Sequence, residues 1–221
     1  MRDFFLHKSI DNLNLIKEDL KSKISNYQNV KVIAVSKTFP MEAIMPLIEY
    51  GHLEYGENKV QEAITKWTEV KLEKPNIKLH LIGKLQTNKV KPALKLFDFI
   101  HSVDTKKLAK KIADEELKQN KKIKIFLQVN IGNEEQKSGI NKDYLNELYL
   151  YCKNLNLDVV GLMCIPPAES KSEIFFKQMA QLTKKYNLKE LSMGMSADYI
   201  DAAKNSSTYI RIGSNIFGKR S

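Results

Sequence analysis

The feature that most constrains the fold is a regular alternation of short apolar runs with amphipathic helical patterns from residue 32 to residue 212. Each run has the length of a buried strand, and several of them stop at a glycine or a proline pair. Parallel strands are joined by helical crossovers, and both faces of their sheet are covered, so such strands are apolar throughout. We therefore predict an α/β fold with a parallel sheet. The eight expected strands cover residues 32–35, 53–55, 79–82, 99–103, 123–131, 157–163, 188–193 and 209–212.

Eight strand–helix units predict a (β/α)₈ barrel of the TIM type, preceded by an extra amphipathic helix. A chain of 221 residues is short beside the roughly 250 residues typical of such barrels, so a doubly wound open sheet is the alternative. No linker divides the chain. We expect one domain over residues 1–221, with the extra helix within 1–28 and the barrel over 30–218. The apolar residues of the extra helix recur every three or four positions, at Ile10, Leu13, Ile16, Leu20 and Ile24.

The net charge of +10 comes from 36 basic and 26 acidic residues, and only three of the basic residues are arginine. Proteins that read nucleic acids rely on arginine forks and aromatic residues, whereas lysines spread over helices form an ordinary solvated surface. We therefore expect no specific nucleic-acid partner, and we keep a basic nucleic-acid-binding protein as an alternative. In a chain so poor in arginine, Arg211 within an apolar strand stands out.

The sequence also limits the compartment and the chemistry. No apolar run approaches the ~20 residues that a membrane span needs, and residues 1–8 lack the apolar core of a signal peptide. Two cysteines do not form a disulfide framework in a chain of this length, so we expect a cytoplasmic protein without a membrane partner. The four histidines show no metal-ligand spacing, and we expect no metal site. We also expect a monomer.

Chemistry in a parallel barrel lies at the carboxyl ends of the strands. Lys37 follows the first expected strand there. An amine whose stem lies in an apolar wall is less readily charged and attacks carbonyl carbons. The alternative is a lysine that extends from the strand end into solvent.

The last two strands are followed by glycine- and serine-containing loops. One loop contains Gly194 and Ser196, and the other contains Gly213 and Ser214. In barrels, the loops after the seventh and eighth strands and a short helix N-terminus commonly form a phosphate site. Glycine lets the backbone approach the anion, and serine adds a hydroxyl donor. The alternative is a pair of ordinary loops whose serines cap helices.

Strand alternation gives Arg211 a direction. If Arg211 shares the inner face with Tyr209, the two isoleucines beside it face the helices, and the inward guanidinium needs an acceptor. The same alternation directs Asn130 inward at the end of the fifth strand. Asn58, after the second strand, is either another polar contact in the site or a helix N-cap.

An amine, a phosphate site and an inward arginine at one barrel mouth fit pyridoxal 5′-phosphate (PLP). This cofactor has an aldehyde, a phosphate and a pyridine nitrogen, which proteins meet with a Schiff-base lysine, backbone donors and an acidic residue or arginine. Arginine does not readily give the ring nitrogen a proton. The ring is then a weaker electron sink than it is beside an aspartate.

Motifs over nearly the whole chain resemble those of the PLP homeostasis proteins, the YggS/PROSC family. The resemblance runs from residue 32 to residue 220. Departures are Leu79 in place of the usual Trp, Tyr55 in place of the common Phe, and Ser206 in place of the usual Gly. The matching motifs are Ala34-Val35-Ser36-Lys37-Thr38, Tyr55-Gly56-Glu57-Asn58-Lys59-Val60-Gln61-Glu62, His80-Leu81-Ile82-Gly83-Lys84-Leu85-Gln86-Thr87-Asn88-Lys89, His101-Ser102-Val103-Asp104, Gln128-Val129-Asn130-Ile131, Lys137-Ser138-Gly139-Ile140, Gly161-Leu162-Met163-Cys164-Ile165-Pro166, Ser192-Met193-Gly194-Met195-Ser196-Ala197-Asp198, Tyr209-Ile210-Arg211-Ile212-Gly213 and Ile216-Phe217-Gly218-Lys219-Arg220.

The resemblance implies a single barrel like the N-terminal domain of alanine racemase, with PLP bound to Lys37 as a Schiff base. It implies that Arg211 contacts the pyridine nitrogen. It also implies that the phosphate is bound at Ser196, Gly213 and Ser214. Members of the family are regarded as PLP carriers or regulators without an established turnover reaction.

We therefore expect a protein that buffers PLP or delivers it to PLP-dependent apoenzymes, and that thereby influences amino-acid metabolism. A PLP-dependent amino-acid racemase is the first alternative. It needs a second acid or base, which in racemases comes from a further domain that we do not expect here. A Schiff-base aldolase would use Lys37 and the phosphate site without a cofactor.

Overall fold

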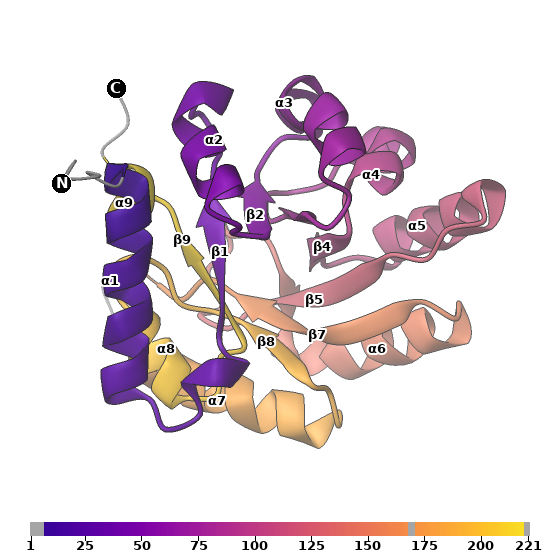
Figure 1. Ribbon diagram of the computed structural model, residues 1–221. Helices are drawn as coiled ribbons and strands as arrows, with labels where there is room; N and C mark the ends of the chain where they lie inside the picture. The colour runs from indigo at the N-terminus through magenta and orange to yellow at the C-terminus, as the bar shows by residue number, and fades with distance from the viewer. Residues whose placement is uncertain (1–6, 168–170, 219–221) are drawn as a thin grey trace, which may run out of the picture.

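The structure is a computed structural model that describes residues 7–167 and 171–218. Within these residues, eight parallel strands form a closed barrel in the order β1-β2-β3-β4-β5-β7-β8-β9, with β9 beside β1 (Figure 1). The β4–β5 pairing leaves no open edge in the barrel. The predicted TIM-type barrel is confirmed, and the open sheet is wrong. The strands are β1 Lys31–Val35, β2 Glu54–Glu57, β3 Lys78–Leu81, β4 Phe99–Val103, β5 Lys124–Asn130, β7 Asp158–Cys164, β8 Glu190–Ser192 and β9 Tyr209–Ile212.

Helices cover the outside of the barrel and connect successive strands (Figure 1). The two-residue strand β6, Ile140–Asn141, adds to β5 outside the barrel and was not predicted. Pro92 is the third residue of α4, where its missing N–H has no intrahelical partner, so it does not interrupt the helix. The α-helices are α1 Lys8–Lys23, α2 Met41–Glu49, α3 Val60–Glu73, α4 Val90–Leu96, α5 Lys106–Gln119, α6 Leu145–Asn154, α7 Ser172–Lys185, α8 Tyr199–Lys204 and α9 Ser214–Phe217. The 3₁₀ helices are η1 Tyr27–Asn29, η2 Thr87–Lys89 and η3 Lys142–Tyr144.

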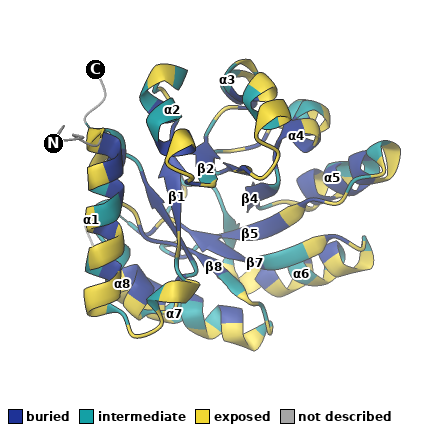
Figure 2. Ribbon diagram, in the orientation of Figure 1, coloured by how far each residue is buried: buried dark blue, intermediate teal, exposed yellow. Residues whose placement is uncertain are grey.

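Strand alternation divides the apolar residues into two layers. One cluster fills the barrel interior, and a larger one lies between strands and helices. Figure 2 shows the result, with buried strands at the centre and helices exposed only on their outer sides. Tyr209 lies in the inner cluster, while Ile210 and Ile212 lie in the outer one, as predicted. The inner cluster consists of Ile33, Val35, Phe99, Phe126, Met163 and Tyr209.

The predicted N-terminal helix is α1, which lies against α8 and α9 (Figure 1). Asn12 Nδ2 donates to the Ile216 carbonyl at 2.9 Å, and the Tyr199 hydroxyl donates to Asp19 Oδ2 at 2.9 Å. These bonds and the burial of α1's apolar face fix the helix over the β1–β9 side of the barrel.

Other predictions concern membrane spans, the cysteines and metal sites. None of the helices in the described part of the chain is long and apolar enough to cross a membrane. Cys152 and Cys164 are buried free thiols. In residues 7–167 and 171–218, no group of three or more His, Cys, Asp or Glu is placed to hold a metal ion. Lys219 and Arg220, which end the last motif, lie outside the described residues.

Candidate functional site

A cavity of about 870 Å³ opens among the residues that follow the carboxyl ends of the strands. All six residues predicted for a cofactor site line it, although they come from the ends of four different strands. Parallel strands of a barrel end at one rim, and this places residues that are distant in the sequence beside one cavity. The six residues are Lys37, Asn58, Ser196, Arg211, Gly213 and Ser214.

Lys37 lies two residues beyond the end of β1 and lines the cavity. Its neighbour Ser36 faces the opposite side, where its hydroxyl donates to Glu57 Oε1 at 2.8 Å. Thr38 has a φ of 69°, which is rare for a β-branched residue, and its amide donates to Glu62 Oε1 at 2.6 Å. The chain thus turns sharply after Lys37, and the alternation of β1 directs this lysine to the inner side.

The carboxylate of Glu57 anchors this turn from behind. Glu57 is fully buried, and its Oε1 accepts from Trp67 Nε1 at 3.0 Å and lies 2.7 Å from Lys66 Nζ. Lys66 Nζ also donates to the carbonyls of Ser36 at 2.8 Å and Phe39 at 3.2 Å. Both ends of the turn that carries Lys37 are therefore held by one buried ion pair. This pair was not predicted from the sequence, because its partners meet only in the folded barrel.

Asn58 lines the cavity and does not cap α3. The helix begins at Val60 with Lys59 as its N-cap residue, and no side-chain hydrogen bond caps it. The N-cap interpretation of Asn58 is therefore wrong. Gly83 lies against the same segment, since a Cβ there would be 2.3 Å from the Asn58 carbonyl oxygen. Only glycine allows the loop after β3 to pass so close to Asn58.

Arg211 points into the barrel, and only 5% of its surface is exposed. Its Nη1 donates to Ser192 Oγ at 2.7 Å, and its Nη2 donates to the Cys164 carbonyl at 2.9 Å. Both acceptors are neutral, and burial lowers the pKa of the guanidinium from its ordinary value. These bonds use two of the five N–H groups of the guanidinium. Because the side chain lines the cavity, one of the remaining N–H groups could donate to an acceptor on a ligand.

The predicted polar contact at Asn130 has another role. Its Nδ2 donates to the Glu134 carbonyl at 2.8 Å, and its Oδ1 accepts from the Glu134 amide at 3.1 Å. Asn130 thus closes the loop after β5. Gln128, two residues earlier on the same face, lines the cavity instead. Strand alternation could have indicated Gln128 as well as Asn130.

The loops after β8 and β9 are bonded to each other at the cavity. Ser196 Oγ lies 3.2 Å from Ser214 Oγ, and Asn215 Nδ2 donates to the Ser196 carbonyl at 3.0 Å. Helix α8 starts later than predicted, at Tyr199, since the Asp198 carboxylate accepts the Met195 amide at 2.7 Å in the preceding turn. Ser196 therefore lies in a loop and does not cap the helix.

The cavity fits the three groups of PLP. Lys37 would supply an amine for an aldehyde, Arg211 a buried donor for a ring nitrogen, and Ser196 and Ser214 hydroxyls for a phosphate. A Cβ at Gly213 would make only ordinary contacts, at 3.5 Å from Val35. Further polar residues of the cavity lining were not predicted from the sequence. They are Lys84, Gln128, Gln136, Lys137 and Ser138.

Comparisons with known proteins place these residues in a family context. The family model of the alanine racemase N-terminal domain matches residues 10–221. A protein of Haemophilus influenzae named pyridoxal phosphate homeostasis protein is 35% identical over 224 residues, which cover 95% of this chain and 94% of the relative. One of the same name from Aquifex aeolicus is 39% identical over 200 residues, covering 86% of this chain and 87% of the relative.

Solved structures agree with the barrel. PipY of Synechococcus elongatus, described with PLP bound, has a TM-score of 0.83 at 32% identity, and the match covers 95% of this chain and 100% of PipY. An alanine racemase of Clostridium difficile has a TM-score of 0.71 at 15% identity, over 93% of this chain and 56% of the racemase. The racemase likeness concerns the fold alone.

Proposed function

Because the chain belongs to the pyridoxal phosphate homeostasis protein family, we propose that it binds PLP at the barrel mouth and keeps the cofactor available inside the cell. The observation that carries the proposal is the meeting of Lys37, Arg211 and the two serines in one cavity. Each of these groups matches a different part of PLP, and they come from separate strand ends. A general anion site would need neither the buried arginine nor the inward lysine.

Each residue has a separate task in this proposal. Lys37 Nζ would bond reversibly to the aldehyde carbon, whose oxygen leaves as water, and Arg211 would donate a hydrogen bond to the ring nitrogen. Ser196 and Ser214 donate to the phosphate, while Gly213 lets the backbone approach it. The Gly213 carbonyl accepts hydrogen bonds from the amides of Ile216 and Phe217. The amides of Ser214 and Asn215 come before these first bonds of α9, so the helix itself does not use them. Asn58 is a further polar contact.

The proposal is one of storage and delivery. Bound PLP supplies an electron sink to amino-acid chemistry, and a ring nitrogen that only accepts from Arg211 weakens that sink. The curated relatives are named for homeostasis of the cofactor. We propose PLP-dependent apoenzymes as recipients, a monomeric state, a cytoplasmic location and no specific nucleic-acid partner. A PLP-dependent racemase is the second candidate, which α-proton exchange of L-amino acids in deuterated water would reveal.

The phosphate assignment predicts a selective loss of affinity in the double variant Ser196→Ala, Ser214→Ala. Hydrogen bonds to a charged group contribute about 1.5–3 kcal/mol each, so the loss of two should weaken PLP binding at least roughly a hundredfold. Pyridoxal, which lacks the phosphate, should bind as it does to the wild type. Equilibrium titrations with both ligands measure the difference.

The matched control is Ser22→Ala on the exposed face of α1, whose hydroxyl bonds only within its own helix, at the Asp19 carbonyl. This variant should bind both ligands normally. Equal weakening of PLP and pyridoxal in the double variant would place the phosphate elsewhere.

A further inference from the structure

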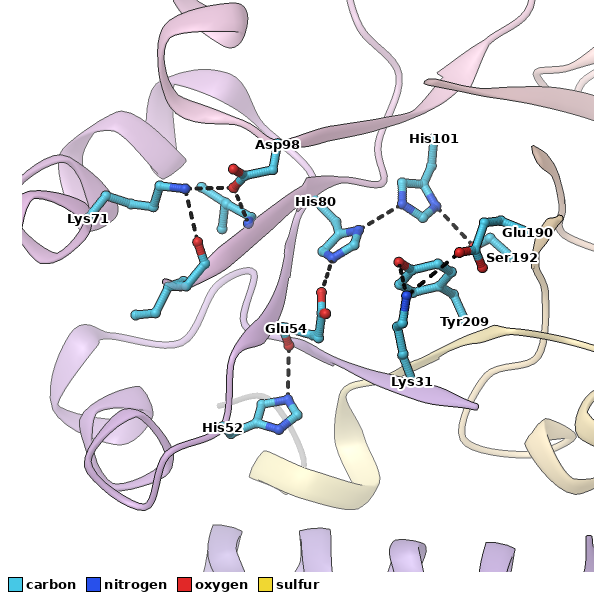
Figure 3. A network of polar contacts seen from close by, with 12 residues as sticks. Lys31, His52, Glu54, Lys71, His80, Asp98, His101, Glu190, Ser192 and Tyr209 are labelled. Atoms are coloured by element: carbon cyan, nitrogen blue, oxygen red, sulfur yellow. Dashed lines mark hydrogen bonds and ion pairs between the residues drawn. The ribbon is translucent and has the colours of Figure 1, made fainter. Parts of the chain in front are cut away.

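A chain of hydrogen bonds crosses the barrel interior from Glu54 to Arg211. Its members come from β2, β3, β4, β8 and β9, and Figure 3 shows the part from Glu54 to Ser192. His80, His101 and Ser192 are fully buried within it. The successive distances are 2.6 Å from Glu54 Oε2 to His80 Nε2, 2.9 Å from His80 Nδ1 to His101 Nε2, 3.0 Å from His101 Nδ1 to Ser192 Oγ, and 2.7 Å from Ser192 Oγ to Arg211 Nη1.

The carboxylate end of this chain and the neutrality of the rings fix the direction of every bond. Glu54 as a carboxylate only accepts, so His80 donates to it from Nε2. In a neutral imidazole the other nitrogen accepts, so His80 Nδ1 accepts from His101 Nε2, and His101 Nδ1 accepts the hydroxyl hydrogen of Ser192. The Ser192 oxygen in turn accepts from Arg211, since a guanidinium only donates. As neutral rings, both histidines are Nε2–H tautomers.

The surroundings favour the neutral rings. Burial lowers the pKa of His80, although the carboxylates of Glu54 and Asp98 oppose the shift; Lys31 acts in the same direction as burial. Burial also lowers the pKa of His101 to well below its ordinary value, and the neighbouring His80 and Arg211 add to this effect. A histidinium at position 101 would put a second buried cation beside the guanidinium.

Aromatic stacking holds the two imidazoles in place. The His80 ring is stacked on Phe99 with centroids 4.3 Å apart, and the His101 ring is stacked on Phe126 at 4.1 Å. The stacking fixes the plane of each ring, and a half-turn within that plane would break the ring's hydrogen bonds. The Ser192 hydroxyl therefore meets a fixed acceptor, and its lone pairs stay directed at Arg211.

We propose that His101 and His80 are positioning residues, which hold the Ser192 hydroxyl as the acceptor that aims the Arg211 guanidinium at the ring nitrogen of the ligand. This inference rests on the proposed function. The chain does not conduct a proton to the ligand, because its last member is an arginine that does not release one. It sets the direction of an N–H donor, so it should affect only those ligands whose ring has an acceptor at that place.

The test compares PLP with its 1-deaza analogue, in which C–H replaces the ring nitrogen. His101→Phe keeps a flat ring beside Phe126 but accepts no bond from Ser192. It should weaken PLP about tenfold, the effect of roughly one hydrogen bond to a charged group, and leave the deaza analogue unchanged. His101→Asn, whose amide oxygen can accept from Ser192, should restore most of the PLP affinity. Ser192→Ala removes the acceptor directly. Like His101→Phe, it should weaken the binding of PLP and leave the binding of the deaza analogue unchanged.

The control variant is His52→Gln, since His52 is a buried histidine outside the chain that bonds to the Glu54 carbonyl at 2.9 Å. It should bind both ligands like the wild type. Equal loss of both ligands in His101→Phe and Ser192→Ala, or loss of neither, would overturn the proposal.

A second measurement does not depend on any variant or ligand. Nitrogen-15 NMR of the wild-type chain at pH 7 should show His80 and His101 as neutral rings protonated at Nε2. A proton on Nδ1 of His101 would overturn the inference. If the wild type binds neither PLP nor its analogue, the proposed function fails, while the tautomers still decide whether the chain is oriented as we infer.

Discussion

Replacing Lys37 with alanine is expected to abolish the covalent retention of PLP. The variant keeps the serines and Arg211 of the cavity, so it should still take up PLP weakly and reversibly. Gel filtration should then remove the cofactor completely, and borohydride reduction should leave no label on the protein. The wild type should keep its visible absorbance through gel filtration and become permanently labelled on reduction.

Lys177→Ala is the matched control for this experiment. Lys177 is an exposed residue of α7, paired with Glu173 at 2.7 Å, and it does not line the cavity. The variant should retain PLP like the wild type. Undiminished labelling of Lys37→Ala would show that another lysine holds the cofactor.

Acidification is expected to destabilise the fold before most carboxylates are protonated. Burial lowers the pKa of His52 from 6.5 to about 4, and it lowers the pKa values of His80 and His101 as well. Between pH 6.5 and 4 the unfolded chain therefore binds protons that the folded chain does not. The free energy of unfolding must therefore fall as the pH falls through this window. Above pH 6.5 the contribution of these three histidines to it does not change with pH.

The expected size of this effect follows from the pKa of His52. A shift from 6.5 to about 4 corresponds to roughly 3 kcal/mol of unfolding free energy lost across the window, and the other two histidines add to it. Urea unfolding at intervals between pH 7.5 and 4.5 measures the slope. His52→Gln can still donate to the Glu54 carbonyl. It should reduce the slope of unfolding free energy against pH by an amount that corresponds to about one bound proton. An unchanged slope would show that His52 is already charged in the folded chain.

The fold was largely predictable from the sequence because most strands contain a short, largely buried apolar run. The predicted limits of β4 and β9 match the structure, and the others differ by a few residues at their ends. Strand ends are set by which backbone groups find partners across the barrel, and apolar spacing does not report this. The two-residue strand β6 was missed because it carries no apolar run of its own.

The candidate site was predictable where a strand leads directly into a polar residue. Lys37 and Arg211 were found in this way, because strand alternation and the barrel rim together give their direction. Contacts that depend on partners from distant strands were not found. Glu57 and Lys66 carry no local signal. Neither do the histidines at 80 and 101, whose chain of bonds exists only once five strands bring its members together.

Peptide mapping after borohydride reduction of the PLP-loaded wild type tests the central claim most directly. Reduction fixes the cofactor to the lysine that holds it, and mass spectrometry of the digest identifies that residue. We predict one pyridoxyl adduct per chain, on the peptide that contains Lys37, at the mouth of the barrel. An adduct on a lysine outside the cavity, with Lys37 unmodified, would contradict the account.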